Sequence, residues 1–231
     1  MHGLFALDIA GTTVDEGNIV YDVLRRAVTE AGATIDESAF ADWTGVEKQW
    51  AIRNLLRLGG ADHDDARVAK VFASFTAMLQ RAYRDTPPRP VAGVETWMRE
   101  ARSAGAAVVL TTGFARPVAD ALLEGLGWRV EAGDADATLD GLICATEVCA
   151  GRPAPYLIQH AMELAGVEDV AQVVAAGDTA ADVLAARHAG VRAVGVLSGA
   201  GSREQLEAAG ADVVVDSVID LSADIATAAI R

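Results

Sequence analysis

Basic residues are scarce in this 231-residue sequence, which has 19 lysines and arginines against 33 aspartates and glutamates and a formal net charge of −14. Proteins that bind nucleic acid or anionic membranes need a basic face for the phosphate groups, so we expect neither partner. A small phosphorylated or phosphonate metabolite stays compatible with this charge. A bound metal ion and a few well-placed cations can reverse the field locally.

Long apolar runs and cysteine pairs are also missing. No uninterrupted stretch approaches the roughly 18 apolar residues of a membrane-spanning helix. The opening residues MHGLFALDIAGTT lack the basic and apolar regions of a signal peptide. The only cysteines, Cys144 and Cys149, are too few for a disulfide framework and do not form a CxxC metal pair. We therefore expect a cytoplasmic protein with reduced thiols.

Short apolar, β-branched runs alternate with amphipathic stretches through most of the chain. This alternation is typical of βαβ units and predicts a Rossmann-like α/β core with a mainly parallel sheet. The predicted strands are Gly3–Leu7, Ala106–Leu110, Gly141–Ala145, Gln172–Ala176, Ala193–Leu197 and Ala211–Val215. The predicted core helices are Val94–Ala104, Arg116–Glu124, Ala154–Ala165, Ala180–Ala189 and Arg203–Ala209.

One segment, from about Asn18 to Asp85, contains amphipathic patterns and no good strand. The predicted helices of this segment are Tyr21–Ala31, Ser38–Trp43, Lys48–Leu58 and Ala66–Arg84. It ends at a proline cluster, residues 86–90, that cannot continue a helix. We predict a core made of residues 1–17 and 87–231, with an all-helical cap domain inserted at 18–86.

Polar residues follow several of the predicted strands. Asp8 ends the first strand, Thr111 and Thr112 end the second, and Asp178 follows the fourth, with Asp182 one helical turn later. The carboxyl ends of parallel strands meet at one edge, so these groups should converge there. Clustered carboxylates repel one another unless a cation lies between them, and magnesium suits carboxylates together with a phosphate oxygen. A single aspartate after a strand is more often a turn residue. The prediction of a magnesium site therefore rests on the whole ordered set of strand-end residues and not on any one of them.

That set of motifs resembles the haloacid dehalogenase superfamily of hydrolases. The resemblance rests on DIAGTT from Asp8, on Thr112-Gly113, on AGRPAP around Arg152 and on GDTAAD from Gly177. The helical insertion also lies where that superfamily places its cap. The runs LDIAGTTVDEG and AGRPAP are most similar to the branch of phosphonoacetaldehyde hydrolases and phosphonatase-like hydrolases.

The resemblance implies a nucleophile and a metal site. Asp8 would attack phosphorus and form an aspartyl-phosphate. Mg²⁺ would be held by Asp8, the backbone carbonyl of Ala10 and Asp178, with Asp182 as a ligand or an outer anchor.

The resemblance also implies groups that hold the phosphoryl oxygens. Backbone N–H groups at Gly11, Thr12 and Gly113 would cradle these oxygens. A hydroxyl would come from Thr112 or Thr111, of which we favour Thr112. Arg152 would neutralise the negative charge that develops during the reaction and orient the nucleophile. The alternative interpretation is that Arg152 is an ordinary loop cation without a role in the site.

Ala10 separates this sequence from most phosphatases of the superfamily, which have an aspartate there to protonate the leaving group. In the phosphonatase branch the leaving group is a carbon, activated by a Schiff base between a cap lysine and the substrate aldehyde. Lys48 and Lys70 are the only lysines in the chain. Lys48 follows Gly45 at the start of a predicted cap helix, as in that branch, whereas Lys70 looks like a surface residue. A solvated Lys48 is the competing interpretation.

The sequence departs from the phosphonoacetaldehyde hydrolase pattern at four positions: Asn18 replaces a cysteine, Thr44 a methionine, Ala51 a histidine and Phe114 a tyrosine. The missing histidine bears most on mechanism, because it assists proton transfer around the Schiff base. The alternative function is therefore a phosphate-monoester phosphatase acting on a small phosphorylated metabolite. A binding module without catalysis is disfavoured by the intact acidic motifs. The resemblance also suggests a homodimer through the cap.

Overall fold

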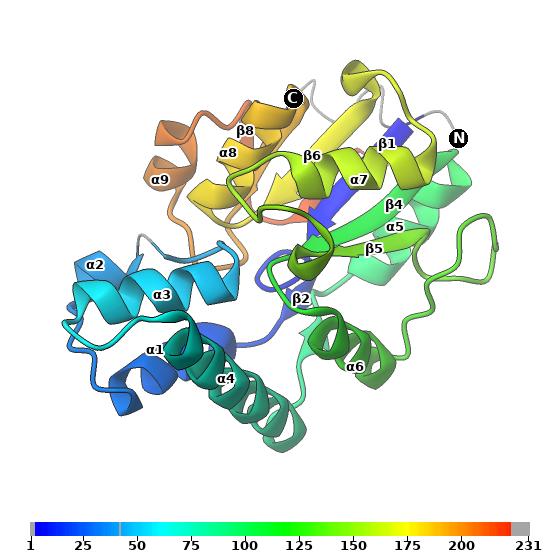
Figure 1. Ribbon diagram of the computed structural model, residues 1–231. Helices are drawn as coiled ribbons and strands as arrows, with labels where there is room; N and C mark the ends of the chain where they lie inside the picture. Colours follow the sequence, from blue (N-terminus) through cyan, green and yellow to red (C-terminus); the bar gives the residue numbers. More distant parts are fainter. Residues whose placement is uncertain (1–2, 42, 223–231) are drawn as a thin grey trace.

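A six-stranded parallel sheet forms the centre of the computed structural model, which describes residues 3–41 and 43–222 (Figure 1). Its strand order is β5-β4-β1-β6-β7-β8. The strands are β1 Gly3–Asp8, β4 Ala106–Thr112, β5 Gly141–Cys144, β6 Val173–Gly177, β7 Arg192–Val196 and β8 Val213–Val215. The predicted α/β class and parallel sheet are confirmed, and β1 lies in the middle of the sheet between β4 and β6.

Helices cover both faces of this sheet. Side chains of β1 alternate between the two faces, with Phe5 and Leu7 in one hydrophobic core and Leu4 and Ala6 in the other. The first core also contains apolar residues of α5 (Val94–Ser103) and α6 (Arg116–Leu126). The second contains those of α7 (Tyr156–Ala165), α8 (Ala180–Ala189) and α9 (Arg203–Ala208). Burial on both faces explains why the strands read as continuous apolar runs.

A helical insertion, the cap, lies between β1/β2 and β4. Its helices are α1 Ile19–Glu30, α2 Glu37–Ala41, α3 Lys48–Leu58 and α4 Asp65–Asp85, and none of the described residues from 18 to 85 is in a strand. The chain enters the cap after β2 (Val14–Asp15) and returns at β3 (Arg89–Pro90), which pair antiparallel. These two-residue strands were not predicted, because they are too short for a periodic pattern. The domain limits 18–86 stay a prediction.

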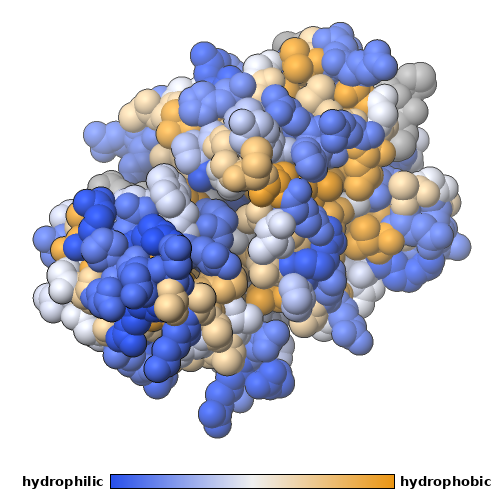
Figure 2. All heavy atoms as spheres, in the orientation of Figure 1, coloured by the Kyte–Doolittle hydropathy of each residue, from blue (hydrophilic) through white to orange (hydrophobic). Residues whose placement is uncertain are grey.

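The cap helices pack through their apolar faces. Leu24 of α1, Ile52 of α3 and Leu79 of α4 are fully buried in the same cluster that includes one face of the sheet. Cap and core therefore share one hydrophobic core. Hydrophilic residues cover much of the lower-left lobe in Figure 2, where Figure 1 places these helices.

Helix boundaries differ from the predictions by a few residues. The helix predicted at Ser38–Trp43 is Glu37–Ala41, with Trp43 beyond its end and Asp42 outside the described residues. The helix predicted from Ala154 begins at Tyr156, with Pro155 at the N-cap position. In the part of the chain that the structure describes, no helix has both the length and the apolar character to cross a bilayer.

A buried ion pair should contribute strongly to stability. Arg102 Nε lies 3.0 Å from Asp140 Oδ2, and the two side chains are 11% and 4% exposed. Arg102→Leu should lower the free energy of unfolding by about 3–5 kcal/mol, because it leaves a buried carboxylate unpaired. Urea unfolding measures this change.

The loss should depend on pH. Burial acts to raise the pKa of Asp140, but hydrogen bonds from Arg102 and Val108 outweigh it, so the pKa is lowered in the folded protein. The stabilisation is thus present above the unfolded-state pKa of about 3.9 and is lost as pH falls through the folded value. Arg26→Leu, which removes an exposed pair with Glu30, should cost no more than about 0.5 kcal/mol. Equal losses in the two variants would contradict this account.

Candidate active site

Asp8 ends the central strand at the edge where the other predicted site residues gather. It is in register with Thr111 at the end of β4, and Asp178 directly follows β6 on the other side. Asp182 lies in the first turn of α8. The sheet therefore brings together the strand-end residues that the sequence analysis singled out.

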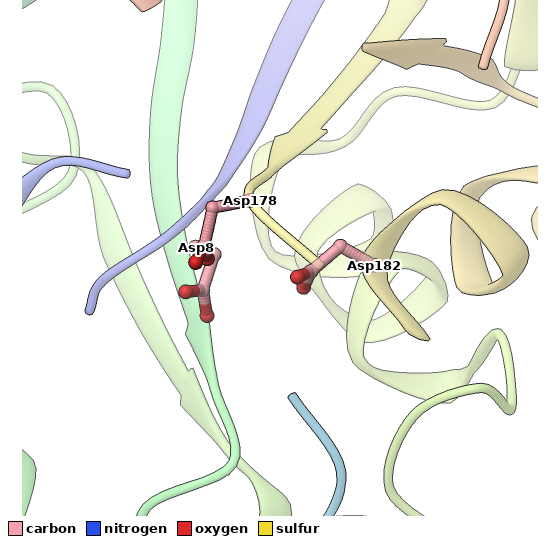
Figure 3. A group of neighbouring side chains, drawn as sticks. All are labelled: Asp8, Asp178 and Asp182. Carbon is pink, nitrogen blue, oxygen red and sulfur yellow. The ribbon is translucent and has the colours of Figure 1, made fainter. Parts of the chain in front are cut away.

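Asp8, Asp178 and Asp182 form a buried acidic group whose side chains face one another (Figure 3). One ligand oxygen from each lies within 4.8 Å of the others. Burial raises the pKa of Asp8 to about 6 although Arg152 acts to lower it. Burial, then Asp182 and Asp8, raises the pKa of Asp178 well above its ordinary value. The pocket thus disfavours three negative charges, which is the condition that a divalent cation relieves.

Arg152 is buried and holds this edge together. Its guanidinium donates to Asp8 Oδ1 at 2.5 Å and to Thr111 Oγ1 at 2.7 Å. Its Nε lies 2.9 Å from Asp182 Oδ1, although the geometry is not that of a hydrogen bond. Burial alone would lower the pKa of Arg152, but Asp182 and Asp8 raise it, so the side chain stays charged. Arg152 is not an ordinary loop cation.

The threonines at the site have distinct partners. Thr111 Oγ1 is bound by Arg152, whereas Thr112 Oγ1 accepts the N–H of Phe114 at 3.1 Å. Thr13, which the sequence analysis did not single out, donates to the backbone carbonyl of Asp8 at 2.9 Å and fixes the end of β1. Our preference for Thr112 as the phosphate-binding hydroxyl stays a prediction.

The turn after Asp8 is tight. Gly11 has φ +81°, and a Cβ there would lie 2.6 Å from Asp178 Oδ2, so the position requires glycine. In this structure the N–H of Gly11 donates to Val14 and that of Thr12 to Ile9. Both groups are therefore engaged within the turn, and their predicted role as a phosphate cradle stays a prediction, as does metal binding by the Ala10 carbonyl.

A glycine-rich loop after β7, residues 198–202, surrounds Asp178. The N–H of Ala200 donates to Asp178 Oδ2 at 2.7 Å, and that of Gly201 donates to the Asp178 carbonyl at 3.0 Å. A Cβ at Gly199 would overlap the Asp178 carboxylate. From the sequence this segment reads as a loop after a strand, without the spacing of a nucleotide-binding motif, and its contacts with Asp178 were not predicted. Two glycines just beyond a strand were the available signal.

Lys48 reaches the site from the cap and is buried. Its Nζ donates to the Val46 carbonyl at 2.9 Å, and it interacts electrostatically with Asp8 and Arg152. Burial is the main cause that lowers its pKa, so the neutral, nucleophilic amine becomes accessible at lower pH than for a solvated lysine. The competing interpretation of a solvated Lys48 is wrong, whereas Lys70 is exposed as predicted.

The segment that precedes Lys48 is seated on the core. Glu47 caps α3 by accepting the N–H groups of Gln49 and Trp50, each at 2.7 Å. The Glu47 side chain packs against Gly151, where an added Cβ would lie only 2.6 Å from the Glu47 Cβ. Gly45, with φ +73°, packs so closely on Thr179 that a side chain would overlap it, and a Cβ at Gly113 would lie 3.1 Å from the Val46 carbonyl. Close backbone approach at three glycines therefore brings Lys48 to the core site, where a Cβ at Gly113 would lie 3.7 Å from Lys48 Nζ.

The four departures from the phosphonoacetaldehyde hydrolase pattern have different environments. Ala51 and Phe114 are buried, and Asn18 is exposed with φ +61°. Trp43, beside Thr44, packs edge-on against Trp50 at 5.1 Å between ring centroids. Ala51 brings no proton-transferring group to α3.

Comparison with known proteins agrees with this geometry. The family model for haloacid dehalogenase-like hydrolases matches residues 2–190. The chain belongs to the haloacid dehalogenase-like hydrolases. A phosphonoacetaldehyde hydrolase from Bacteroides fragilis is 30% identical over 212 residues, covering 84% of this chain and 75% of the relative. A phosphoglycolate phosphatase from Cupriavidus necator is 30% identical over 222 residues, covering 94% and 90%.

Solved structures show the same fold. A phosphonoacetaldehyde hydrolase-like protein from Oleispira antarctica superposes with a TM-score of 0.81 at 22% identity, covering 99% of this chain and 93% of that one. A hydrolase from Pseudomonas syringae gives a TM-score of 0.81 at 20% identity, covering 94% and 95%. This haloacid dehalogenase-like hydrolase is thus related to both phosphonatases and phosphatases.

Gly199→Ala should weaken divalent-cation binding by this hydrolase at least about tenfold, because the new methyl group displaces the Asp178 carboxylate. Titration calorimetry with Mg²⁺ or Mn²⁺ measures the affinity. Gly125→Ala in α6, where a Cβ meets no atom within 4 Å, should leave it unchanged. Unaltered affinity in Gly199→Ala would rule out the bracing role of the loop.

Proposed function

We propose that this protein is a magnesium-dependent, phosphonatase-like hydrolase that removes the phosphoryl group from a small phosphonate aldehyde such as phosphonoacetaldehyde. The observation that carries the proposal is the Lys48 amine, buried by the cap beside Asp8 and Arg152. A phosphate monoester needs no nucleophilic amine for its hydrolysis, whereas imine formation requires the neutral amine. The phosphonoacetaldehyde hydrolases among the relatives support the same substrate class.

The fit of magnesium rests on the donor set. Three buried carboxylates within 4.8 Å, two of them with raised pKa values, suit a hard divalent cation. Asp8, the Ala10 carbonyl and Asp178 would hold it, with Asp182 as a ligand or an anchor. When bound, the cation would neutralise charge on the phosphoryl oxygens and on the nucleophile.

Lys48 activates the substrate in this proposal. Its nitrogen adds to the aldehyde carbon, and water leaves to give a protonated imine. A carboxylate oxygen of Asp8 then forms a bond to phosphorus. The carbon–phosphorus bond breaks, and its electron pair moves into the imine to give an enamine.

Two hydrolyses complete the cycle. Water attacks the aspartyl-phosphate, which releases inorganic phosphate and restores Asp8. Protonation of the enamine carbon and hydrolysis of the imine release the aldehyde and restore Lys48. Arg152, which binds Asp8 at 2.5 Å, holds the nucleophile in place throughout. The closed cap excludes bulk water.

Phosphate-monoester hydrolysis is the alternative function. The phosphoglycolate phosphatase relative, matched over 94% of this chain, favours it. Against it stands Ala10, which has no proton to give to a departing alkoxide. The homodimer and the cytoplasmic location expected from the sequence stay predictions.

Lys48→Arg should abolish phosphate release from phosphonoacetaldehyde, because a guanidinium keeps the positive charge but cannot form the imine. The phosphate released from phosphonoacetaldehyde is measured, and so is the phosphate released from each of a panel of small phosphate monoesters. Lys70→Arg, an exposed position on α4, is the matched control and should keep wild-type rates. Release from esters alone, unaffected by Lys48→Arg, would establish the phosphatase instead.

Asp8→Asn should lower turnover of every phosphoryl substrate by at least about 10⁴-fold, because an amide oxygen is a far weaker nucleophile than a carboxylate. Single-turnover phosphate release measures the rate. Imine trapping at Lys48 with borohydride should persist in this variant. More than trace turnover would contradict Asp8 as the nucleophile.

A further inference from the structure

Tyr21, in the first turns of α1, lies against the Lys48 side chain. Lys48 Nζ is 5.6 Å from the centroid of the Tyr21 ring. The Tyr21 hydroxyl accepts the backbone N–H of Gly45 at 3.1 Å. One aromatic side chain thus contacts both the amine and the loop that carries it.

The Tyr21 hydroxyl interacts electrostatically with the acidic group of the core. Burial is the first cause that raises its pKa well above 10, and Asp178, Asp8 and Asp182 add to it. The phenol therefore keeps its proton across the working range of an enzyme. Among the described residues the structure gives the hydroxyl a donor, Gly45, but no acceptor for its own proton. A neutral O–H group is thus carried by the ring over which the Lys48 amine lies.

Imine formation needs such a group. Attack by an amine on an aldehyde places negative charge on the carbonyl oxygen, and that oxygen must then leave as water. Ala51, one turn after Lys48 on α3, is buried, and its side chain offers no hydrogen bond. The Lys48 amine itself donates to Val46. The Tyr21 ring packs against this amine, which makes its hydroxyl the candidate donor to the aldehyde oxygen.

We propose that Tyr21 is a further catalytic residue, whose hydroxyl donates a hydrogen bond to the carbonyl oxygen of the aldehyde while Lys48 attacks its carbon. The proposal rests on the Schiff-base function given above. The new carbon–nitrogen bond forms as the carbonyl π-electron pair moves to oxygen. A proton passes from the lysine nitrogen to that oxygen, a second comes from solvent, and water departs. Tyr21 keeps its own proton and stabilises the charge on oxygen.

Tyr21→Phe tests this role, since it keeps the ring against Lys48 and removes the hydroxyl. The rate of borohydride trapping with phosphonoacetaldehyde, followed by intact-protein mass, should fall about 10²-fold, the low end for the loss of one such donor. Beryllofluoride binding to Asp8 with Mg²⁺, followed by ¹⁹F NMR, should be unchanged. This second readout needs no aldehyde and reports an intact core site.

Tyr83→Phe is the matched control. Tyr83 lies on the cap helix α4, and its hydroxyl donates to Glu16 at 3.3 Å, not to the Gly45 loop. This variant also removes one partly buried cap hydroxyl and should keep the wild-type trapping rate.

The outcomes separate the two proposals. Trapping at the wild-type rate in Tyr21→Phe would overturn the role of Tyr21 and leave the Schiff-base function standing. An equal loss of trapping and beryllofluoride binding would also overturn it, by showing that the substitution disturbs the site as a whole. Absence of any adduct in the wild-type protein would overturn the Schiff-base function and the role of Tyr21 together.

Discussion

The rest of the site depends on the burial of three carboxylates around one buried guanidinium. Arg152 contacts Asp8 and Asp182 within 3 Å and also binds the end of β4 through Thr111. Burial makes the carboxylates of Asp8 and Asp178 costly to ionise, and only part of that cost is offset by a single positive charge. The remaining imbalance is what a bound divalent cation would relieve.

A second constraint is the close contact between cap and core. Gly45, Gly113 and Gly151 allow backbone to approach backbone or side chain where any larger residue would overlap a neighbour. The segment before α3 thereby settles on the loops that hold Asp8 and Arg152. Lys48 is then removed from water, and the loss of hydration lowers its pKa. The contacts that seat the cap on the core are therefore the same contacts that bury the amine.

The glycine-rich loop after β7 holds one member of the acidic group, Asp178, in place. Two of its backbone N–H groups donate to Asp178, one to the carboxylate and one to the carbonyl. Such bracing fixes the direction of a carboxylate that would otherwise turn away from its like-charged neighbours. The core and the cap thus each contribute positioning contacts: the loop orients Asp178, and the Glu47 cap on α3 orients Lys48.

The sequence by itself determined the α/β class, the six strands to within one or two residues, the helical insertion and the acidic strand ends. Apolar runs buried on both faces, helical periodicity and motif order are local signals, so they survive in one dimension. Only the tertiary structure decided whether Lys48 was solvated or buried, and which residues brace Asp178. It also brought Tyr21 to the amine. Those facts depend on contacts between α1, α3 and the core loops, which are far apart in the chain, and no local pattern records them.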